Sequence, residues 1–125
     1  MTNIATFART APFFPSSQLE TADIIHSFNW VSGACGYESS KKYQVRYLHG
    51  FDSLGRMNIE DNTNLTEQQR LLDTWELKIF ENAESLIAQS AYLAENFAKL
   101  YPVKFRDKLI IIPPGIDHEL FSPMV

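Results

Sequence analysis

Residues with the chemistry of a binding site are concentrated in His49-Gly-Phe-Asp-Ser-Leu-Gly-Arg56, which combines an imidazole, a carboxylate, a hydroxyl and a guanidinium. The preceding residues, Val45 to His49, are predicted to form a β-strand that ends at this segment. Open α/β sheets bind their ligands at the carboxyl ends of parallel strands. The candidate binding residues are therefore His49, Gly50, Ser53, Gly55 and Arg56.

Two further groups could contribute to binding. Gly33 and Gly36 are predicted to lie in the first turn of a helix that follows a strand, where free N–H groups and the helix dipole favour an anion. Small residues that let a helix approach a sheet explain them equally well, and their spacing is not a dinucleotide or Walker motif. Arg70 could reach the same pocket from a helix start, although a surface position is the simpler interpretation.

Plainer alternatives remain open for several residues. Ser53 could be a turn or cap hydroxyl, and Arg56 a solvated surface charge. His26, at the end of the first predicted strand, could face a cleft or be hydrogen-bonded at the rim of the core. Together with His118 in the tail, the histidines show no paired spacing, so no metal site is expected.

The elements that must position these residues alternate along the chain. Strands are predicted over residues 22–27, 45–49, 85–89 and 109–112, and helices over 30–43, from Thr66 and from Ser90. This order is typical of repeated βαβ units, which favour a parallel sheet with right-handed crossovers. The predicted fold is α/β, a Rossmann-like parallel sheet with helices on both faces. A single phosphate-binding domain of the receiver type is the second choice.

Two predicted helices carry start signals. Thr66 and Gln69 have the chemistry of a capping box, and Ser90 can cap the next helix, which Pro102 ends. In the first of these helices an apolar stripe is expected to face the sheet, with Glu76 largely off it. The members of this stripe are Leu72, Trp75, Ile79 and Ala83.

The loop and the tail are also informative. Residues 50–65 are predicted to form a polar loop, and a loop of about 15 residues in a small domain is more often functional than idle. Residues 109–112 have no polar break, which predicts a strand covered on both faces. Pro113, Pro114 and Gly115 force a turn, in which Gly115 is expected to adopt a backbone angle denied to other residues.

Composition limits the class of protein. The 125 residues, 45% of them hydrophobic, can bury one ordinary core. A formal charge of −4 provides no basic surface for nucleic acid, which is not an expected partner. Cys35 is the single cysteine, so no disulfide forms within the chain and a reducing compartment fits best. Without a run of about 20 apolar residues, a transmembrane segment is not expected, and we predict a cytoplasmic protein.

Four segments carry a family resemblance by their order and spacing: residues 22–33, 49–56, 83–101 and 112–123. Together they resemble family 4 retaining glycosyltransferases, near the sucrose-phosphate-synthase-like branch. The resemblance implies two facing Rossmann-like domains in the GT-B arrangement. In that arrangement the N-terminal domain holds the acceptor, the C-terminal domain holds a nucleotide-sugar, and hexosyl transfer takes place between them.

The resemblance covers only the later part of the first domain. It implies an irregular N-terminal segment over residues 1–20 and a partial acceptor-side domain over 21–112. Residues 113–125 would then form an interdomain hinge with Pro114, Gly115 and Asp117, and the second domain would be absent. Asp117 is expected to form hydrogen bonds across this hinge. The absent domain would normally supply the Arg/Lys pair and the carboxylates that bind the donor.

Two positions depart from the family pattern. Asp52 stands where the family usually carries a histidine that points at the donor sugar, and Asn58 stands where a lysine is common. No catalytic residue is therefore assured. The resemblance implies no cofactor; a nucleotide-sugar donor would be a substrate of the assembled enzyme.

Three functions remain open. The chain could be part of a glycosyltransferase that needs a complementary donor-domain chain, with a sugar or sugar phosphate as acceptor. It could be a non-catalytic remnant that binds a sugar or a partner through residues 50–65. It could also be a truncated remnant whose open sheet edge makes it unstable or oligomeric.

Overall fold

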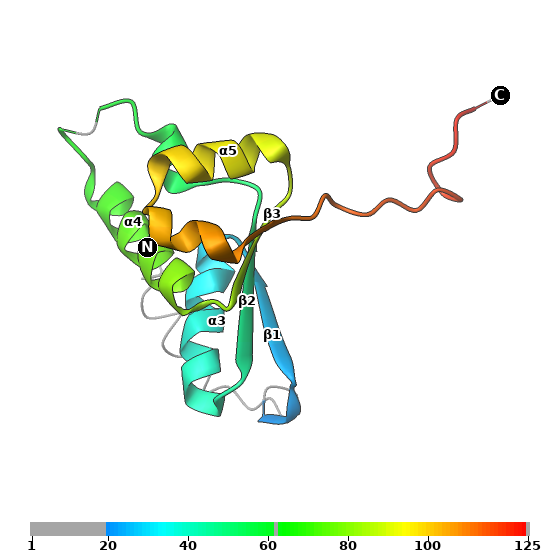
Figure 1. Ribbon diagram of the computed structural model, residues 1–125, viewed down its shortest axis with the longest axis horizontal. Helices are drawn as coiled ribbons and strands as arrows, with labels where there is room; N and C mark the ends of the chain where they lie inside the picture. Colours follow the sequence, from blue (N-terminus) through cyan, green and yellow to red (C-terminus); the bar gives the residue numbers. More distant parts are fainter. Residues whose placement is uncertain (1–19, 62, 125) are drawn as a thin grey trace.

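The computed structural model describes residues 20–61 and 63–124, so nearly all of the predicted N-terminal segment lies outside the described residues. Its centre is a parallel sheet of four strands in the order β1-β2-β3-β4 (Figure 1). The strands are β1 (Ile24–Phe28), β2 (Arg46–Phe51), β3 (Ser85–Ala88) and β4 (Leu109–Ile111). The connecting helices are α3 (Asn29–Tyr43), α4 (Glu67–Asn82) and α5 (Ala91–Leu100), with short 3-10 helices η2 (Gly55–Asn58) and η3 (Val103–Lys108).

These elements confirm the predicted α/β Rossmann-like fold. Each predicted strand and helix is present, with its ends displaced by at most two residues. The predicted loop at residues 50–65 is shorter, because β2 continues to Phe51 and η2 forms within the loop. The hydrophobic core is aromatic: Phe51 of β2 lies 5.9 Å from Phe80 of α4 and 5.5 Å from Phe97 of α5 between ring centroids. Offset and edge-to-face contacts of this kind stabilise a core beyond the area that they bury.

The glycines of α3 allow it to lie close to the sheet and to α4. A Cβ atom on Gly33 would lie 2.7 Å from Cδ1 of Ile79, and one on Gly36 would lie 2.7 Å from Cε2 of Tyr47. The prediction that both glycines lie in the first helical turn is wrong, because α3 begins at Asn29 and places them in its second turn or later. The alternative interpretation, small residues at a close helix contact, agrees with these distances.

The predicted helix starts are observed. The hydroxyl of Thr66 accepts the N–H of Gln69 at 3.2 Å, and the side chain of Gln69 accepts the N–H of Thr66 at 2.8 Å. The hydroxyl of Ser90 accepts the N–H of Leu93 at 3.2 Å. One detail of α4 was predicted wrongly: Glu76 is not off the buried stripe, since only 4% of it is exposed. It lies four residues from both Leu72 and Phe80, on the same face of the helix.

The prediction that the last strand is covered on both faces is also wrong. Ile110 and Ile111 are 47% and 50% exposed. In the described part of the chain β4 pairs with β3 alone and is an edge strand. Its start is held by Lys108, whose Nζ donates to the carbonyl oxygens of Phe80, Glu81 and Ala83 at 2.7, 2.8 and 3.0 Å. This contact ties β4 to the end of α4.

Residues 113–124 are exposed and lead away from the sheet (Figure 1). The expectation for Gly115 is wrong, because no described glycine has a positive φ. Asp117 makes a local turn, in which its Oδ1 accepts the N–H groups of Glu119 at 2.9 Å and Leu120 at 3.1 Å. Its described hydrogen bonds therefore stay within the tail. The predicted hinge residues Pro114, Gly115 and Asp117 all lie in this exposed tail.

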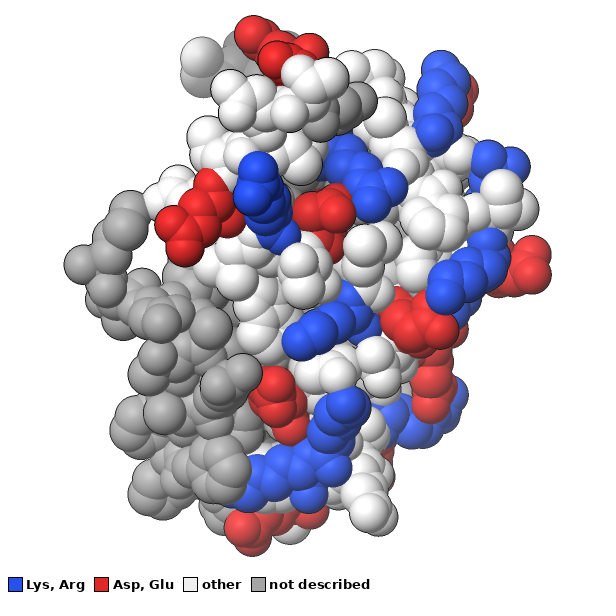
Figure 2. All heavy atoms as spheres, turned by 90° about the vertical axis from the view of Figure 1, so that its left-hand side faces the viewer, with Lys and Arg blue, Asp and Glu red and all other residues white. Residues whose placement is uncertain are grey.

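The surface charges are mixed. Figure 2 shows the side of the molecule on which α4 lies, where basic and acidic side chains alternate. Two of the ion pairs are exposed: Lys104 to Glu81 at 2.7 Å and Arg46 to Glu84 at 3.0 Å. Within residues 20–61 and 63–124, no helix has the length and apolar character needed to cross a bilayer.

Candidate functional site

A pocket of about 240 Å³ lies at the carboxyl ends of β2 and β3. One wall is the segment that follows β2, and the other is the start of α5. The residues that line the pocket are Asp52, Ser53, Leu54, Met57, Asn58, Ser90, Tyr92 and Leu93. Among the predicted site residues, Ser53 lines the pocket together with Asp52, the residue noted for its departure from the family pattern.

Asn29 fixes Asp52 at the mouth of this pocket. The Nδ2 of Asn29 donates to Oδ1 of Asp52 at 2.9 Å, and the N–H of Asp52 donates to Oδ1 of Asn29 at 3.1 Å. Asn29 joins β1 directly to α3 with a φ of 60°, in the left-handed region that asparagine tolerates better than most residues. Sequence reasoning missed Asn29, although an asparagine between a predicted strand and a predicted helix is a signal for this conformation.

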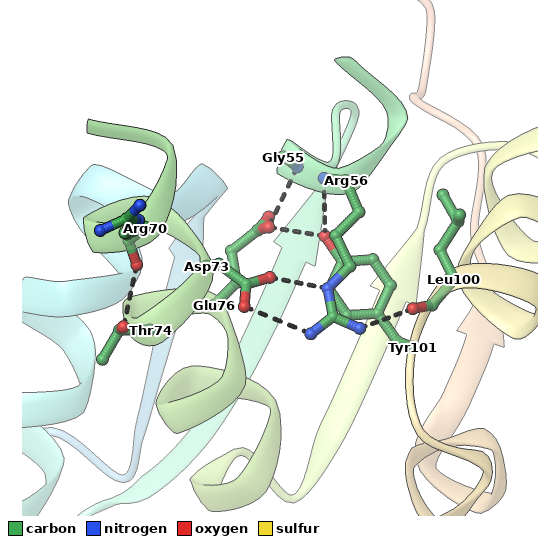
Figure 3. Close-up of polar contacts among 8 residues, drawn as sticks. All are labelled: Gly55, Arg56, Arg70, Asp73, Thr74, Glu76, Leu100 and Tyr101. Carbon is green, nitrogen blue, oxygen red and sulfur yellow. Dashed lines mark hydrogen bonds and ion pairs between the residues drawn. The ribbon is translucent and has the colours of Figure 1, made fainter. Parts of the chain in front are cut away.

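Arg56 does not line the pocket. Its Nε donates to Oδ1 of Asp73 at 2.6 Å, a second nitrogen lies 3.2 Å from Oδ2, and a third donates to the carbonyl of Leu100 at 2.7 Å. The guanidinium also stacks 4.8 Å from the ring centroid of Tyr101. Figure 3 shows it enclosed among these three residues. The hydrogen bond and charge of Asp73 raise the pKa of Arg56, so the arginine ties η2 to α4 and α5 as a permanent cation.

Glu76 of α4 is hydrogen-bonded to the start of η2, the segment that contains Arg56. Its Oε1 accepts the N–H of Gly55 at 3.0 Å and the hydroxyl of Tyr101 at 2.6 Å (Figure 3). Burial raises the pKa of Glu76 to about 7, against the hydrogen bonds of Tyr101 and Gly55, which favour the ionised form. A Cβ on Gly55 would lie 1.9 Å from Cδ2 of Leu72, so a larger residue at this position would require the Leu72 side chain to move. Sequence reasoning placed Gly55 near the site but missed the role of Glu76.

His49 lies in the core, 1% exposed, and outside the lining of the pocket. Its Nδ1 is 2.8 Å from Oγ of Ser27, which is 2.7 Å from the hydroxyl of Tyr47; that hydroxyl donates to the carbonyl of Gly33 at 2.9 Å. Because the single proton of Tyr47 goes to Gly33, Ser27 must donate to Tyr47 and accept from His49. This chain requires a proton on Nδ1 of His49. Burial and the nearby His26 lower the pKa of His49 to about 3, so the ring stays neutral.

The remaining predicted residues lie apart from the pocket. Gly50 is buried in β2, where a Cβ would lie 3.1 Å from Phe28. Gly33 is buried in α3, which gives an anion no access to it. Arg70 is exposed on α4, and Figure 3 draws it apart from the Arg56 cluster. His26 is exposed in β1. In the described part of the chain, no cluster of three or more His, Cys, Asp or Glu side chains could hold a metal ion.

The electrostatics of the pocket are set by few groups. The start of α5 contributes a positive dipole end, which is worth about 0.3–1 kcal/mol to an exposed anion. The hydroxyl of Ser90 already satisfies one of the free N–H groups at this end. A hydrogen bond to a charged side chain contributes about 1.5–3 kcal/mol. No lysine or arginine lines the pocket. The helix dipole is therefore a weak substitute for a basic side chain in binding an anion, and the carboxylate of Asp52 opposes it.

A parallel α/β sheet with a pocket at the carboxyl ends of adjacent strands defines a Rossmann-like domain with a candidate ligand site. The sequence is more specific: residues 7–120 match the family model for Glycosyltransferase Family 4. This match covers most of the chain, which therefore belongs to glycosyltransferase family 4.

Curated relatives agree with this family. The chain is 31% identical over 102 residues to a D-inositol 3-phosphate glycosyltransferase of Arthrobacter sp. (strain FB24), a match covering 81% of the chain and 24% of the relative. It is 25% identical over 123 residues to the protein of that name from Corynebacterium diphtheriae, covering 98% of the chain and 29% of the relative. The chain thus spans about a quarter of the length of the relatives that it matches.

Proposed function

We propose that this chain forms the acceptor-binding part of a retaining, nucleotide-sugar-dependent hexosyltransferase. The observation that carries the proposal is the pocket of about 240 Å³ at the carboxyl ends of β2 and β3, which contains Ser53 of the motif at residues 49–56. The name of the curated relatives supports a phosphorylated cyclitol among the sugars and sugar phosphates that we consider as acceptors. The resemblance carried jointly by residues 22–33, 49–56, 83–101 and 112–123 supports a place near the sucrose-phosphate-synthase-like branch.

The proposal assigns roles to three side chains. Ser53 would hydrogen-bond an acceptor hydroxyl, and Asp52 and Asn58 would line the mouth and wall of the same pocket. Retaining transfer also needs groups that stabilise the leaving diphosphate. The eight residues that line the pocket include no lysine or arginine for that purpose. We propose that a further domain or a complementary chain supplies the donor site, and that residues 1–125 alone bind without transferring sugar.

A binding experiment tests this function. Amide spectra of the labelled chain are recorded during titration with myo-inositol, glucose, their monophosphates and nucleotide-sugars. We expect saturable shifts at residues 52–58 and 90–93, which border the pocket, and none in the tail at 113–124. Dispersed spectra of a folded protein without any saturable shift at millimolar ligand would reject the proposal.

A second function is favoured by Asp52, which replaces the usual histidine of the family motif. A carboxylate at this position would repel the donor diphosphate, so the whole protein could bind an acceptor without turnover. Release of nucleotide from a nucleotide-sugar separates the two functions. Acceptor binding without release, even in the presence of a complementary chain, would favour the binding protein. The single Cys35 and the use of a nucleotide-sugar support a reducing, cytoplasmic setting for either function.

A further inference from the structure

The polar groups of the pocket are unusual for a site that would bind a phosphate. The lining combines one carboxylate, two aliphatic hydroxyls, one amide and one phenol with three apolar side chains. The polar members are Asp52, Ser53, Asn58, Ser90 and Tyr92. Phosphate recognition depends on arginine, lysine or several free N–H groups. None of the eight lining residues is basic, and one of the N–H groups at the start of α5, that of Leu93, already donates to the hydroxyl of Ser90. The remaining N–H groups at this end add only the weak dipole term, which Asp52 opposes.

Arg56, the cation of the site motif, is not available to the pocket. All three guanidinium nitrogens have partners in the protein, two on Asp73 and one on the carbonyl of Leu100. Moving the guanidinium toward the pocket would break these bonds and its stacking on Tyr101. It would also leave Asp73, which is only partly exposed, without its counterion.

Asp52 gives the mouth of the pocket a negative charge. Asn29 holds one of its carboxylate oxygens at 2.9 Å, while the residue remains exposed to solvent. A carboxylate accepts strong hydrogen bonds from the hydroxyls of a polyol and repels a phosphate group. Asn58 can both donate and accept, and Ser53 can do the same, which suits the vicinal hydroxyls of a ring. The volume of about 240 Å³ lies below the range of drug-sized pockets and suits a single ring.

We propose that this pocket selects an uncharged polyhydroxylated ring, a cyclitol or monosaccharide, over its phosphorylated form. Asp52 and Asn58 determine this selectivity. The inference rests on the proposed function, because it takes the pocket to be the acceptor site. It extends the proposed function by specifying that the acceptor is uncharged. In this respect it differs from the phosphorylated substrate in the name of the curated relatives.

The test compares neutral and phosphorylated probes on the full chain. Dissociation constants for myo-inositol, D-inositol 3-phosphate and inorganic phosphate are measured from amide shifts at residues 52–58, at neutral pH and equal ionic strength. We expect myo-inositol to bind at least about fivefold more tightly than its phosphate, with inorganic phosphate giving no saturable shift. Equal or tighter binding of the phosphate would overturn the inference and leave the proposed function intact. Absence of binding by these probes, and by glucose, its phosphate and the nucleotide-sugars of the titration above, would overturn both.

Two variants locate the selectivity. Asp52→Asn removes the charge and keeps an oxygen for Asn29, so the preference for the neutral ring should fall about threefold through tighter phosphate binding. Asn58→Lys adds a cation to the lining and should reverse the preference. Glu95→Gln makes the same charge change as the first variant on an exposed residue of α5 outside the lining, and should leave the preference unchanged. Identical ratios in all four proteins would overturn the assignment.

Discussion

Asn29 combines an uncommon backbone conformation with the two hydrogen bonds that orient Asp52. The left-handed conformation costs an ordinary residue about 1–2 kcal/mol, and glycine almost nothing. Each hydrogen bond contributes about 0.5–1.5 kcal/mol. The energetic contributions of the backbone conformation and of the two hydrogen bonds to Asp52 can therefore be separated by substitutions at this one position.

We expect Asn29→Ala to lose about 2–3 kcal/mol of unfolding free energy, because the alanine is strained and both bonds are lost. Asn29→Gly loses the bonds without the strain, and its cost should be smaller by about 1–2 kcal/mol. Urea denaturation measures both values. The amide resonance of Asp52 should move in both variants, since its N–H loses the same acceptor. Equal destabilisation by alanine and glycine would contradict a strained backbone at residue 29.

At the level of elements, the close contact of α3 with α4 and the sheet depends on Gly33. Alanine is the better helix former by about 1 kcal/mol, but its Cβ would lie 2.7 Å from Ile79 and 2.8 Å from His49. Both neighbours are buried, so relief requires movement of the core, at a cost of about 1–3 kcal/mol. The steric cost should exceed the gain in helix propensity.

We therefore expect Gly33→Ala to lower the melting temperature by several degrees, as overpacking of about 1–2 kcal/mol does in a domain of this size. Gly115→Ala is the matched control, because a Cβ at that position meets nothing within 4 Å and φ is not positive. Its melting temperature should equal or slightly exceed that of the parent chain. A Gly33→Ala protein as stable as the control would show that α3 can move away from the sheet.

The same elements show what sequence reasoning can reach. The capping box at Thr66 and the cap at Ser90 are local in sequence, and the structure confirms them. The wrong predictions concern partners far along the chain. Glu76 can be buried because Tyr101 and Gly55 donate hydrogen bonds to its carboxyl group, and periodicity within α4 does not contain that information.

The candidate site was predictable to a similar degree. The position of Ser53 after β2 follows from the rule for parallel strands, and the structure places it in the pocket. The partners of Arg56 could not be predicted, because Asp73 and Leu100 come from two other helices. The exposure of β4 could not be predicted either, since an apolar run has the same sequence in the centre and at the edge of a sheet.

At the scale of the whole molecule, two buried groups give stability opposite dependences on pH. The pKa of Glu76 rises from 4.5 to about 7 on folding, so its contribution is complete below pH 4.5 and is lost as the pH rises to 7. The pKa of His49 falls from 6.5 to about 3, so its contribution is complete above pH 6.5 and is lost as the pH falls toward 3. Each slope approaches about 1.4 kcal/mol per pH unit, and the two cancel where they overlap.

Removing either Glu76 or His49 by substitution should reveal the pH dependence of the unfolding free energy that the other group causes between pH 4.5 and 6.5. In Glu76→Gln the unfolding free energy should rise with pH relative to the parent chain, by up to about 1.4 kcal/mol per unit. In His49→Asn, which retains a donor for Ser27, it should fall by a similar amount. Urea denaturation at several pH values within this window gives the slopes. Curves parallel to that of the parent chain would contradict the assigned burial of these groups.

The contact of Lys108 with the end of α4 has a consequence for chemical labelling. An amine that donates to three carbonyl oxygens has no lone pair directed at an acylating reagent. Burial lowers the pKa of Lys108, but the reagent can reach its nitrogen only after these hydrogen bonds have broken. An exposed lysine such as Lys99 should react first with a limiting amount of an activated ester. Acylation of Lys108 would then follow the detachment of β4, and its rate, read by mass spectrometry, would report how often the edge strand opens.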